Sequence, residues 1–206
     1  MLQNEDYVLI GVVATERTGK STYIRDKIIR GGGYDFRKQT CIILTEANPS
    51  CYDKYPRANT WQELERVKRG VVKFWDWEAE DEMEMMKRFR SMLQKGMFNN
   101  GLVVMEDAGI YLTSNTPTEV KSIVLSRRMY KIDVVAVFHS FRDYPPFMRR
   151  RTNHFIVGVN LDNFTKPDEL QALQFPAADK LFAANQEVQH TKLTNRFKKK
   201  IVSTGL

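Results

Sequence analysis

YVLIGVVATERTGKST, residues 7–22, is the stretch that decides the fold of this chain. Tyr7 to Val13 form a short β-branched apolar run bounded by polar residues, a pattern typical of a strand buried on both faces. Ala14 to Ser21 follow directly and fit the pattern of a phosphate-binding loop, with Ala14 where the first glycine usually stands. The sequence therefore predicts a strand that leads into a loop built to hold phosphate groups.

A helix is expected after this loop, because apolar residues recur at helical spacing until the chain reaches Gly31–Gly33. In such a loop, backbone N–H groups surround the β-phosphate, Lys20 reaches the β- and γ-phosphates, and the Ser21 hydroxyl ligates Mg²⁺. Gly19 stands where the backbone crowds the phosphate. We therefore expect a nucleoside triphosphate with Mg²⁺, and the expected binding residues are Ala14, Thr15, Glu16, Arg17, Thr18, Gly19, Lys20, Ser21 and Thr22.

Apolar runs alternate with helical or loop segments along most of the chain, which predicts an α/β fold with a mostly parallel central sheet flanked by helices. Helices are expected over 78–95 and around 167–173. We expect one domain over 1–206, with an irregular insertion at 31–70 and a basic C-terminal tail at 190–206. The runs that predict further strands are 41–44, 71–75, 102–105, 134–138 and 155–159.

The composition excludes several classes of protein. Hydrophobic residues make up 42% and charged residues 28% of the 206 residues, which is ordinary globular usage. No apolar run approaches the roughly 20 residues of a membrane helix, and the N-terminus does not resemble a secretion signal, so we expect a protein that is neither secreted nor membrane-spanning. Cys41 and Cys51 belong to no metal-binding cluster. The net charge of +7 favours contact with polyanions.

A second chemistry-bearing segment is LVVMED, residues 102–107, an apolar strand that ends in two acids as a Walker B strand does. One acid can hold the hydration shell of Mg²⁺ while the next positions the attacking water. By position Glu106 should serve the metal and Asp107 the water, although the more familiar order is Asp then Glu, so the roles could be exchanged. The paired acids favour hydrolysis over binding alone.

A third segment, SRRMYKI at 126–132, leads into a strand that ends at His139. In ring-forming phosphate-loop ATPases, an arginine of one subunit completes the site of the next subunit. Arg128 is the first candidate for this role and Arg127 the second, while the alternative is that both solvate a helix end. His139 can contact the γ-phosphate, or it is a hydrogen-bonded histidine at the end of a strand.

Two further segments are strongly basic. FRDYPPFMRRR, residues 141–151, mixes aromatics, a proline pair and arginines, which suits nucleic-acid backbone contact, a surface between subunits or a rigid solvated loop. Arg196–Lys200 could touch phosphates nonspecifically or form a plain terminal tail.

Together, ATERTGKST, LVVMEDAG and the segment from Ser126 to Gly158 resemble the FtsK/HerA superfamily of DNA-pumping ATPases, over about residues 7 to 160. In that family an arginine, a strand and then a polar sensor, usually Gln, follow Walker B. Arg128 and His139 stand at the matching spacing, with His in place of Gln. The chain looks most like the small genome-packaging ATPases of membrane-containing and related icosahedral viruses.

This resemblance implies a homo-oligomeric ring, a pentamer or hexamer, that uses ATP to move double-stranded DNA into a preformed capsid. Capsid or portal-vertex proteins are the implied partners, and the virion vertex or host cytoplasm is the implied location. ATP rather than GTP also rests on the resemblance, since no Asn-Lys-x-Asp segment that reads the base is visible.

Three other readings stay open. The first is a small kinase that phosphorylates a nucleotide or metabolite, with Arg142 and Arg149–Arg151 as a closing lid. The second is a morphogenesis or secretion ATPase that acts on protein at a membrane. The third is a nucleotide-gated scaffold that binds ATP with little hydrolysis.

Overall fold

The computed structural model describes residues 7–32, 40–46, 49–98, 100–191 and 195–205, and their strands form a sheet with the order β3-β4-β2-β5-β6-β1-β7-β8. The pairs β1–β7, β2–β4, β2–β5 and β3–β4 are parallel, while β7 and β8 are antiparallel. The mostly parallel sheet flanked by helices that the sequence predicts is confirmed. The strands are β1 Leu9–Val13, β2 Thr40–Leu44, β3 Arg57–Ala58, β4 Gly70–Phe74, β5 Gly101–Met105, β6 Ile132–Phe138, β7 His154–Val157 and β8 Lys200–Ser203.

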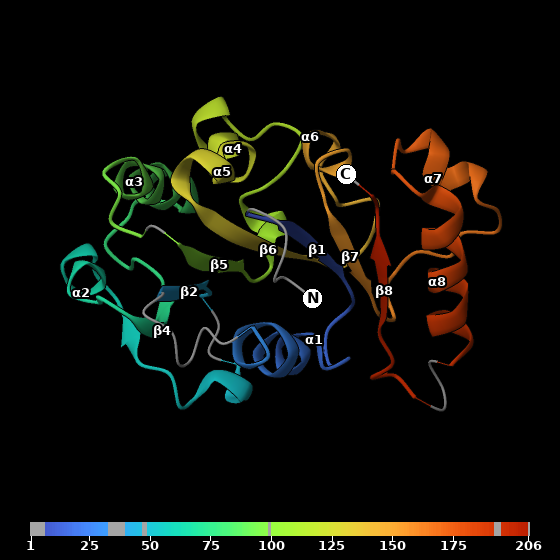
Figure 1. The fold of residues 1–206 in the computed structure, drawn as a ribbon, viewed down its shortest axis with the longest axis horizontal. Helices are drawn as coiled ribbons and strands as arrows, with labels where there is room; N and C mark the ends of the chain where they lie inside the picture. Colours follow the sequence, from blue (N-terminus) through green and yellow to red (C-terminus); the bar gives the residue numbers. More distant parts are fainter. Residues whose placement is uncertain (1–6, 33–39, 47–48, 99, 192–194, 206) are drawn as a thin grey trace. The chain divides into compact units, whose positions relative to one another are not determined.

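Helical segments connect most of the strands (Figure 1). Two of the short ones are 3₁₀ turns, η2 (Ser50–Tyr52) and η3 (Ala108–Ile110), and η1 (Ile24–Arg30) is a π-helical continuation of α1. The α-helices are α1 Lys20–Tyr23, α2 Trp61–Glu65, α3 Glu82–Gln94, α4 Thr118–Leu125, α5 Arg127–Tyr130, α6 Pro146–Arg149, α7 Asp168–Ala172 and α8 Ala178–His190.

The central strands form because short runs of β-branched and other apolar residues can be covered on both faces. Every residue of β1, β2 and β5 is buried, as parallel strands require. Helix α3 begins later than the predicted residue 78, because the Asp81 side chain caps it by accepting a hydrogen bond from the Glu84 N–H at 2.7 Å.

The single domain expected over 1–206 divides by its internal contacts into two compact units. The first unit comprises the described residues of Met1–Val8, Ser21–Glu106 and Thr116–Val135. It contains the parallel strands β3-β4-β2-β5, and helices α3 and α4 pack against each other. The stretch 31–70, expected to be an irregular insertion, includes β2, η2, β3 and α2 in its described part.

The second unit comprises the described residues of Leu9–Lys20, Asp107–Asn115 and Ala136–Leu206. Here α8 packs on α7, β7 and β8. A cluster of six aromatic rings fills its core, formed by Phe138, Phe141, Tyr144, Phe155, Phe164 and Phe175. Helix α8 and strand β8 were not predicted, and β8 occupies part of the stretch expected to be a basic tail.

Across the described ranges, no helix has both the length and the apolar character needed to cross a lipid bilayer.

Gly11 in β1 sits where a side chain does not fit. A β-carbon at this position would lie 2.8 Å from Tyr144 and 2.9 Å from Phe155, two fully buried rings. We predict that Gly11→Ala lowers the free energy of unfolding by about 1–3 kcal/mol, because the rings must shift within a close-packed core. Urea denaturation measures this change.

Gly109→Ala is the matched control, since its β-carbon would meet only Phe138 at the ordinary contact distance of 3.9 Å. It should not destabilise the protein. Equal loss of stability in the two variants would show that the space beside β1 is not limiting.

Candidate functional site

The loop from Ala14 to Lys20 is held at its start by two neighbouring segments of the second unit. The Ala14 N–H donates to the Phe138 carbonyl at 2.9 Å, and the Thr15 N–H donates to the Val159 carbonyl at 2.7 Å. These bonds continue the pairing of β1 beyond its last residue. The loop therefore begins at a fixed position at the carboxyl edge of the sheet, where α/β proteins bind ligands.

Two residues of the loop adopt the left-handed backbone conformation, Arg17 with φ of 55° and Gly19 with φ of 75°. The Thr18 hydroxyl donates to the Thr15 carbonyl at 2.7 Å and closes the turn from inside. Alternation of right- and left-handed residues turns successive N–H groups toward one side, which forms a concave site for anions. Glu16 and Arg17 are exposed, so their side chains do not fill the concave side of the loop.

Lys20, Asp107 and His139, three of the predicted site residues, meet in the second unit. The Lys20 ammonium lies 3.1 Å from Asp107 Oδ1, and His139 Nε2 lies 3.3 Å from the same oxygen. Asp107 has a left-handed backbone, with φ of 47°, where the chain turns from β5 into η3. One carboxylate thus contacts both the loop lysine and the histidine that follows β6.

Glu106 has a different environment from the adjacent Asp107. Its side chain is buried in the first unit, and the Tyr52 hydroxyl donates to Glu106 Oε1 at 2.7 Å. Burial and the neighbouring Glu106 charge hold the pKa of Tyr52 well above its usual value, so the phenol keeps its proton and acts as the donor. Glu106 is therefore a buried, oriented carboxylate.

Tyr52 was missed by the sequence analysis, because it lies in the stretch expected to be irregular. The only signal was a tyrosine in a turn rich in Pro and Ser, NPSCY, and nothing in that pattern connects it to a residue 54 positions away.

Ser21 and Thr22, also predicted to bind the nucleotide and metal, follow Lys20 in α1. They belong to the first unit together with Glu106. Ser21 is partly exposed and Thr22 is exposed.

The structure separates the two arginines that were candidates for an inter-subunit role. Arg127 is buried, and its guanidinium donates to the Tyr7 carbonyl at 2.8 Å and to the Val124 carbonyl at 3.4 Å. Arg128 is exposed on the same short helix. Arg127 is thus engaged inside the first unit, and Arg128 is the one available to a partner.

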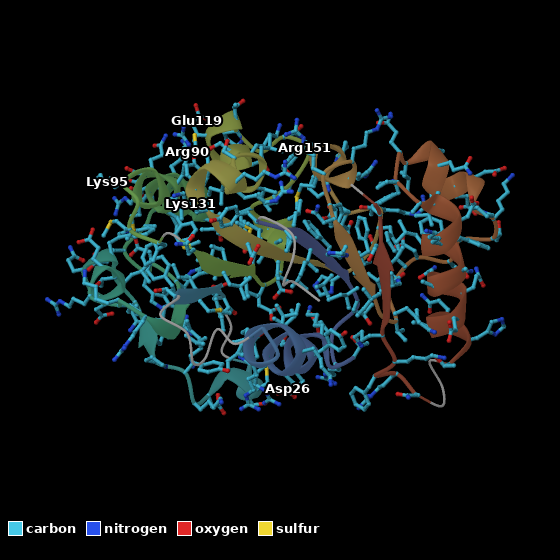
Figure 2. All side chains as sticks on the ribbon, viewed as in Figure 1. Asp26, Arg90, Lys95, Glu119, Lys131 and Arg151 are labelled. Carbon is cyan, nitrogen blue, oxygen red and sulfur yellow. The ribbon has the colours of Figure 1, made fainter. Side chains whose placement is uncertain are left out.

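Helices α3 to α5 of the first unit carry both basic and acidic residues. Figure 2 shows Arg90 and Lys95 beside α3 and Lys131 beside α5. Glu119 of α4 is the acidic residue labelled there.

The basic segment 141–151 is largely engaged within the second unit. Arg149 is buried, donates to the Tyr144 and Leu173 carbonyls, and lies over the Phe175 ring. Arg142 pairs with Asp162 and Glu169, each at 3.5 Å. Arg150 and Arg151 are exposed.

A cavity of about 790 Å³ opens beside Asp107 and His139 in the second unit. Glu16 of the loop also lines this cavity, so the loop and the pair Asp107 and His139 share it. The rest of its wall comes from η3 with the turn after it, from Phe138 and from segment 141–151 as far as Arg149.

Comparison with known proteins identifies the fold. The sequence matches no protein-family model, and no curated protein matches it. The structure is similar to that of B204, the DNA-packaging ATPase from Sulfolobus turreted icosahedral virus, with a TM-score of 0.66 and 14% identity over 96% of this chain and 93% of that chain. It is also similar to the genome packaging NTPase B204 from Sulfolobus turreted icosahedral virus 2 in complex with ATP-gammaS, with a TM-score of 0.64 and 13% identity over 96% and 92% of the two chains. The resemblance to viral packaging ATPases is thus confirmed at the level of the fold.

Arg127 and Arg128 allow a matched test of the structural assignment. We predict that Arg127→Ala lowers the free energy of unfolding by about 1–3 kcal/mol, because it removes the donor to two backbone carbonyls. Arg128→Ala should stay within about 0.5 kcal/mol of wild type, as surface substitutions usually do. Thermal or urea unfolding provides the measurement, and the reverse order of the two variants would contradict the assignment.

Proposed function

We propose that this protein is an ATPase that hydrolyses ATP with Mg²⁺ and uses the energy to translocate double-stranded DNA, in the manner of a genome-packaging motor. The observation that carries the proposal is the contact of Asp107 with both Lys20 and His139, beside a loop in which Arg17 and Gly19 have a left-handed backbone. The shared fold with packaging NTPases supports it.

The loop and Lys20 would bind the triphosphate. Backbone N–H groups near Arg17 and Gly19 face the phosphate oxygens, and the Lys20 ammonium neutralises charge on the β- and γ-phosphates. Since the same ammonium contacts Asp107, the triphosphate competes with that carboxylate for Lys20. Binding would therefore release Asp107 for another partner.

Asp107 is the residue we propose to orient the attacking water. Its carboxylate is partly exposed and lines the cavity, so a water molecule can reach it. His139 Nε2 lies beside the same carboxylate oxygen, to which it can only donate, and the ring can follow the position of the γ-phosphate. Because His139 directly follows β6, loss of the γ-phosphate could change the contact of His139 with Asp107 and so shift the end of β6.

The residues present fit Mg²⁺, with Ser21 and Glu106 as its proposed protein partners. Both supply oxygen atoms, the donors that this ion prefers, and Tyr52 orients the buried Glu106 carboxylate. In the described part of the chain no cluster of three or more His, Cys, Asp or Glu side chains is placed to hold a metal ion. Mg²⁺ in nucleotide sites is usually held by one or two side chains together with phosphate oxygens and water. When bound, Mg²⁺ would offset the charge of the phosphates.

Translocation requires basic residues that can contact the DNA backbone, and this chain has exposed residues of that kind. The net charge of +7 and the exposed Arg128 and Lys131 suit a DNA backbone or a neighbouring subunit. A homo-oligomeric pentamer or hexamer at the virion vertex or in the host cytoplasm, with capsid or portal-vertex proteins as partners, completes the proposal. The kinase alternative is less well supported, because two of the four arginines expected to form its lid, Arg142 and Arg149, are engaged in internal contacts.

Steady-state ATP hydrolysis, with and without double-stranded DNA, tests the proposed function. We expect cooperative dependence on protein concentration and stimulation by DNA that weakens as salt rises, since phosphate contacts release counterions. Asp107→Asn should bind ATP and lose at least about a hundredfold in turnover. Phosphate transferred to an added nucleotide, or activity indifferent to DNA and concentration, would favour a kinase.

Mixing two inactive variants tests whether Arg128 acts in a neighbouring subunit. We expect Arg128→Ala to bind ATP but lose most turnover, by about a thousandfold or more for an arginine that acts across an interface. Mixed with Asp107→Asn, it should regain part of the activity, because some interfaces then combine an intact Arg128 with an intact Asp107.

The control mixes Asp107→Asn with Lys20→Ala, two changes on the same side of such an interface, and should regain nothing. Full turnover in Arg128→Ala alone would remove this arginine from the mechanism.

A further inference from the structure

The segment before β8 lies at the edge of the sheet where the phosphate loop begins. In the second unit Val13, the last residue of β1, is in register with Val157 of β7, and Val157 is in register with Lys200, the first residue of β8. Because β8 runs antiparallel to β7, the residues just before Lys200 emerge at the carboxyl end of β1. Residues Arg196 to Lys199 therefore reach the loop from a part of the sequence far from it.

Two side chains of this segment contact the loop. The Lys199 ammonium donates to the Thr18 carbonyl at 2.7 Å, and its aliphatic stem covers Gly158, where a β-carbon would meet Lys199 Cδ at 2.8 Å. A β-carbon at Gly19 would lie 3.0 Å from Phe197 Cδ1 and 3.6 Å from Cε1. Burial lowers the pKa of Lys199 to about 8, which fits a side chain held against the protein.

Phe197 contacts the loop without being buried by it. The atoms nearest Gly19, Cδ1, Cε1 and Cγ, form one edge of the ring, and the residue as a whole is 58% exposed. The Arg196 guanidinium lies 5.0 Å from the ring centroid, at a distance typical of a cation–π contact. Because Arg196 lies over one face of the ring, the opposite face is the one on which a flat, polarisable ligand can stack.

A triphosphate bound as proposed above would run from Asp107 toward this ring. Asp107 and His139, the groups proposed for the γ-phosphate, lie on the β6 side of β1, since His139 directly follows β6. Phe197 and Lys199 lie on the other side, toward β7 and β8. A triphosphate with its γ end at Asp107 would carry its ribose and base away from that side.

We propose that Phe197 is the platform on which the base of the bound nucleoside triphosphate stacks, an inference that rests on the proposed function. Arg196 adds a second planar group at the same ring. Stacking uses the π face that every base has and reads no hydrogen-bonding edge, so the site accepts ATP and GTP alike and favours purines by their larger area. This assigns a base-binding residue in a chain that has no Asn-Lys-x-Asp segment.

Comparing binding of ATP, GTP and inorganic tripolyphosphate, each with Mg²⁺, tests this proposal by calorimetry. Tripolyphosphate keeps the phosphate contacts and lacks the base. We expect Phe197→Ala and Phe197→Leu to weaken ATP and GTP binding by about five- to a hundredfold, the range that stacking on one aromatic ring contributes. Tripolyphosphate binding should stay within about twofold of wild type, and Phe197→Trp should retain nucleotide affinity.

Trp77→Ala is the matched control, because Trp77 is equally exposed, at 57%, and also carries an arginine over its ring, Arg57 at 5.6 Å. It should leave all three affinities unchanged. Phe197→Leu keeps apolar bulk against Gly19, so it separates loss of the aromatic face from loss of packing on the loop.

Two results would overturn the inference. Unchanged ATP affinity in Phe197→Ala would show that the base lies elsewhere. A parallel loss of tripolyphosphate and ATP affinity would show that the ring shapes the loop instead of binding the base. In both cases wild type still binds ATP and the proposed function stands, whereas a wild-type protein that binds neither ligand would reject the proposed function itself.

Discussion

The position of the phosphate loop depends on two backbone hydrogen bonds at the end of β1. The Ala14 and Thr15 N–H groups donate to the carbonyls of Phe138 and Val159, which lie beyond or at the ends of the neighbouring strands. Because these two N–H groups are already bonded within the protein, only the N–H groups after Thr15 are left to face a ligand. The left-handed residues Arg17 and Gly19 complete that turn, and Lys20 then enters the helix with its side chain beside Asp107.

The two adjacent acids differ in backbone geometry and in environment, which is the basis for the different roles we propose for them. Glu106 ends in a buried environment and is oriented by the hydroxyl of Tyr52, whereas Asp107 turns through a left-handed conformation and contacts Lys20 and His139. A buried carboxylate with a fixed donor suits an ion whose position must not vary. A partly exposed carboxylate beside a cavity suits a water molecule that must exchange in every cycle. The order Glu then Asp is therefore compatible with the same chemistry as the more familiar order.

The sequence alone predicts those parts of the fold that depend on residues close together in the chain. The β-branched runs of β1, β2 and β5 could be predicted because burial on both faces requires such residues. The glycine, lysine and serine of the loop match the pattern of a phosphate-binding loop, and phosphate binding there stays a prediction. Helix α8 and strand β8 were not predicted. Strand β8 forms by pairing with β7, and only Val202 of its four residues is buried, so it lacks the apolar run that marks the central strands. Tyr52 and Phe197 escaped prediction because each acts on a residue distant in the sequence. Arg127 and Arg128 are adjacent and chemically identical, so only the folded structure shows which one is buried.

Calorimetric titration of MgATP into wild type and Lys20→Ala is the most direct test of the central claim, that the loop from Ala14 to Ser21 binds a nucleoside triphosphate through Lys20. We predict saturable binding of one nucleotide per chain in wild type, and an affinity lower by about tenfold or more in Lys20→Ala, because a charge-assisted hydrogen bond is lost. Equal affinity in the two proteins, or no binding by folded wild type, would contradict the account.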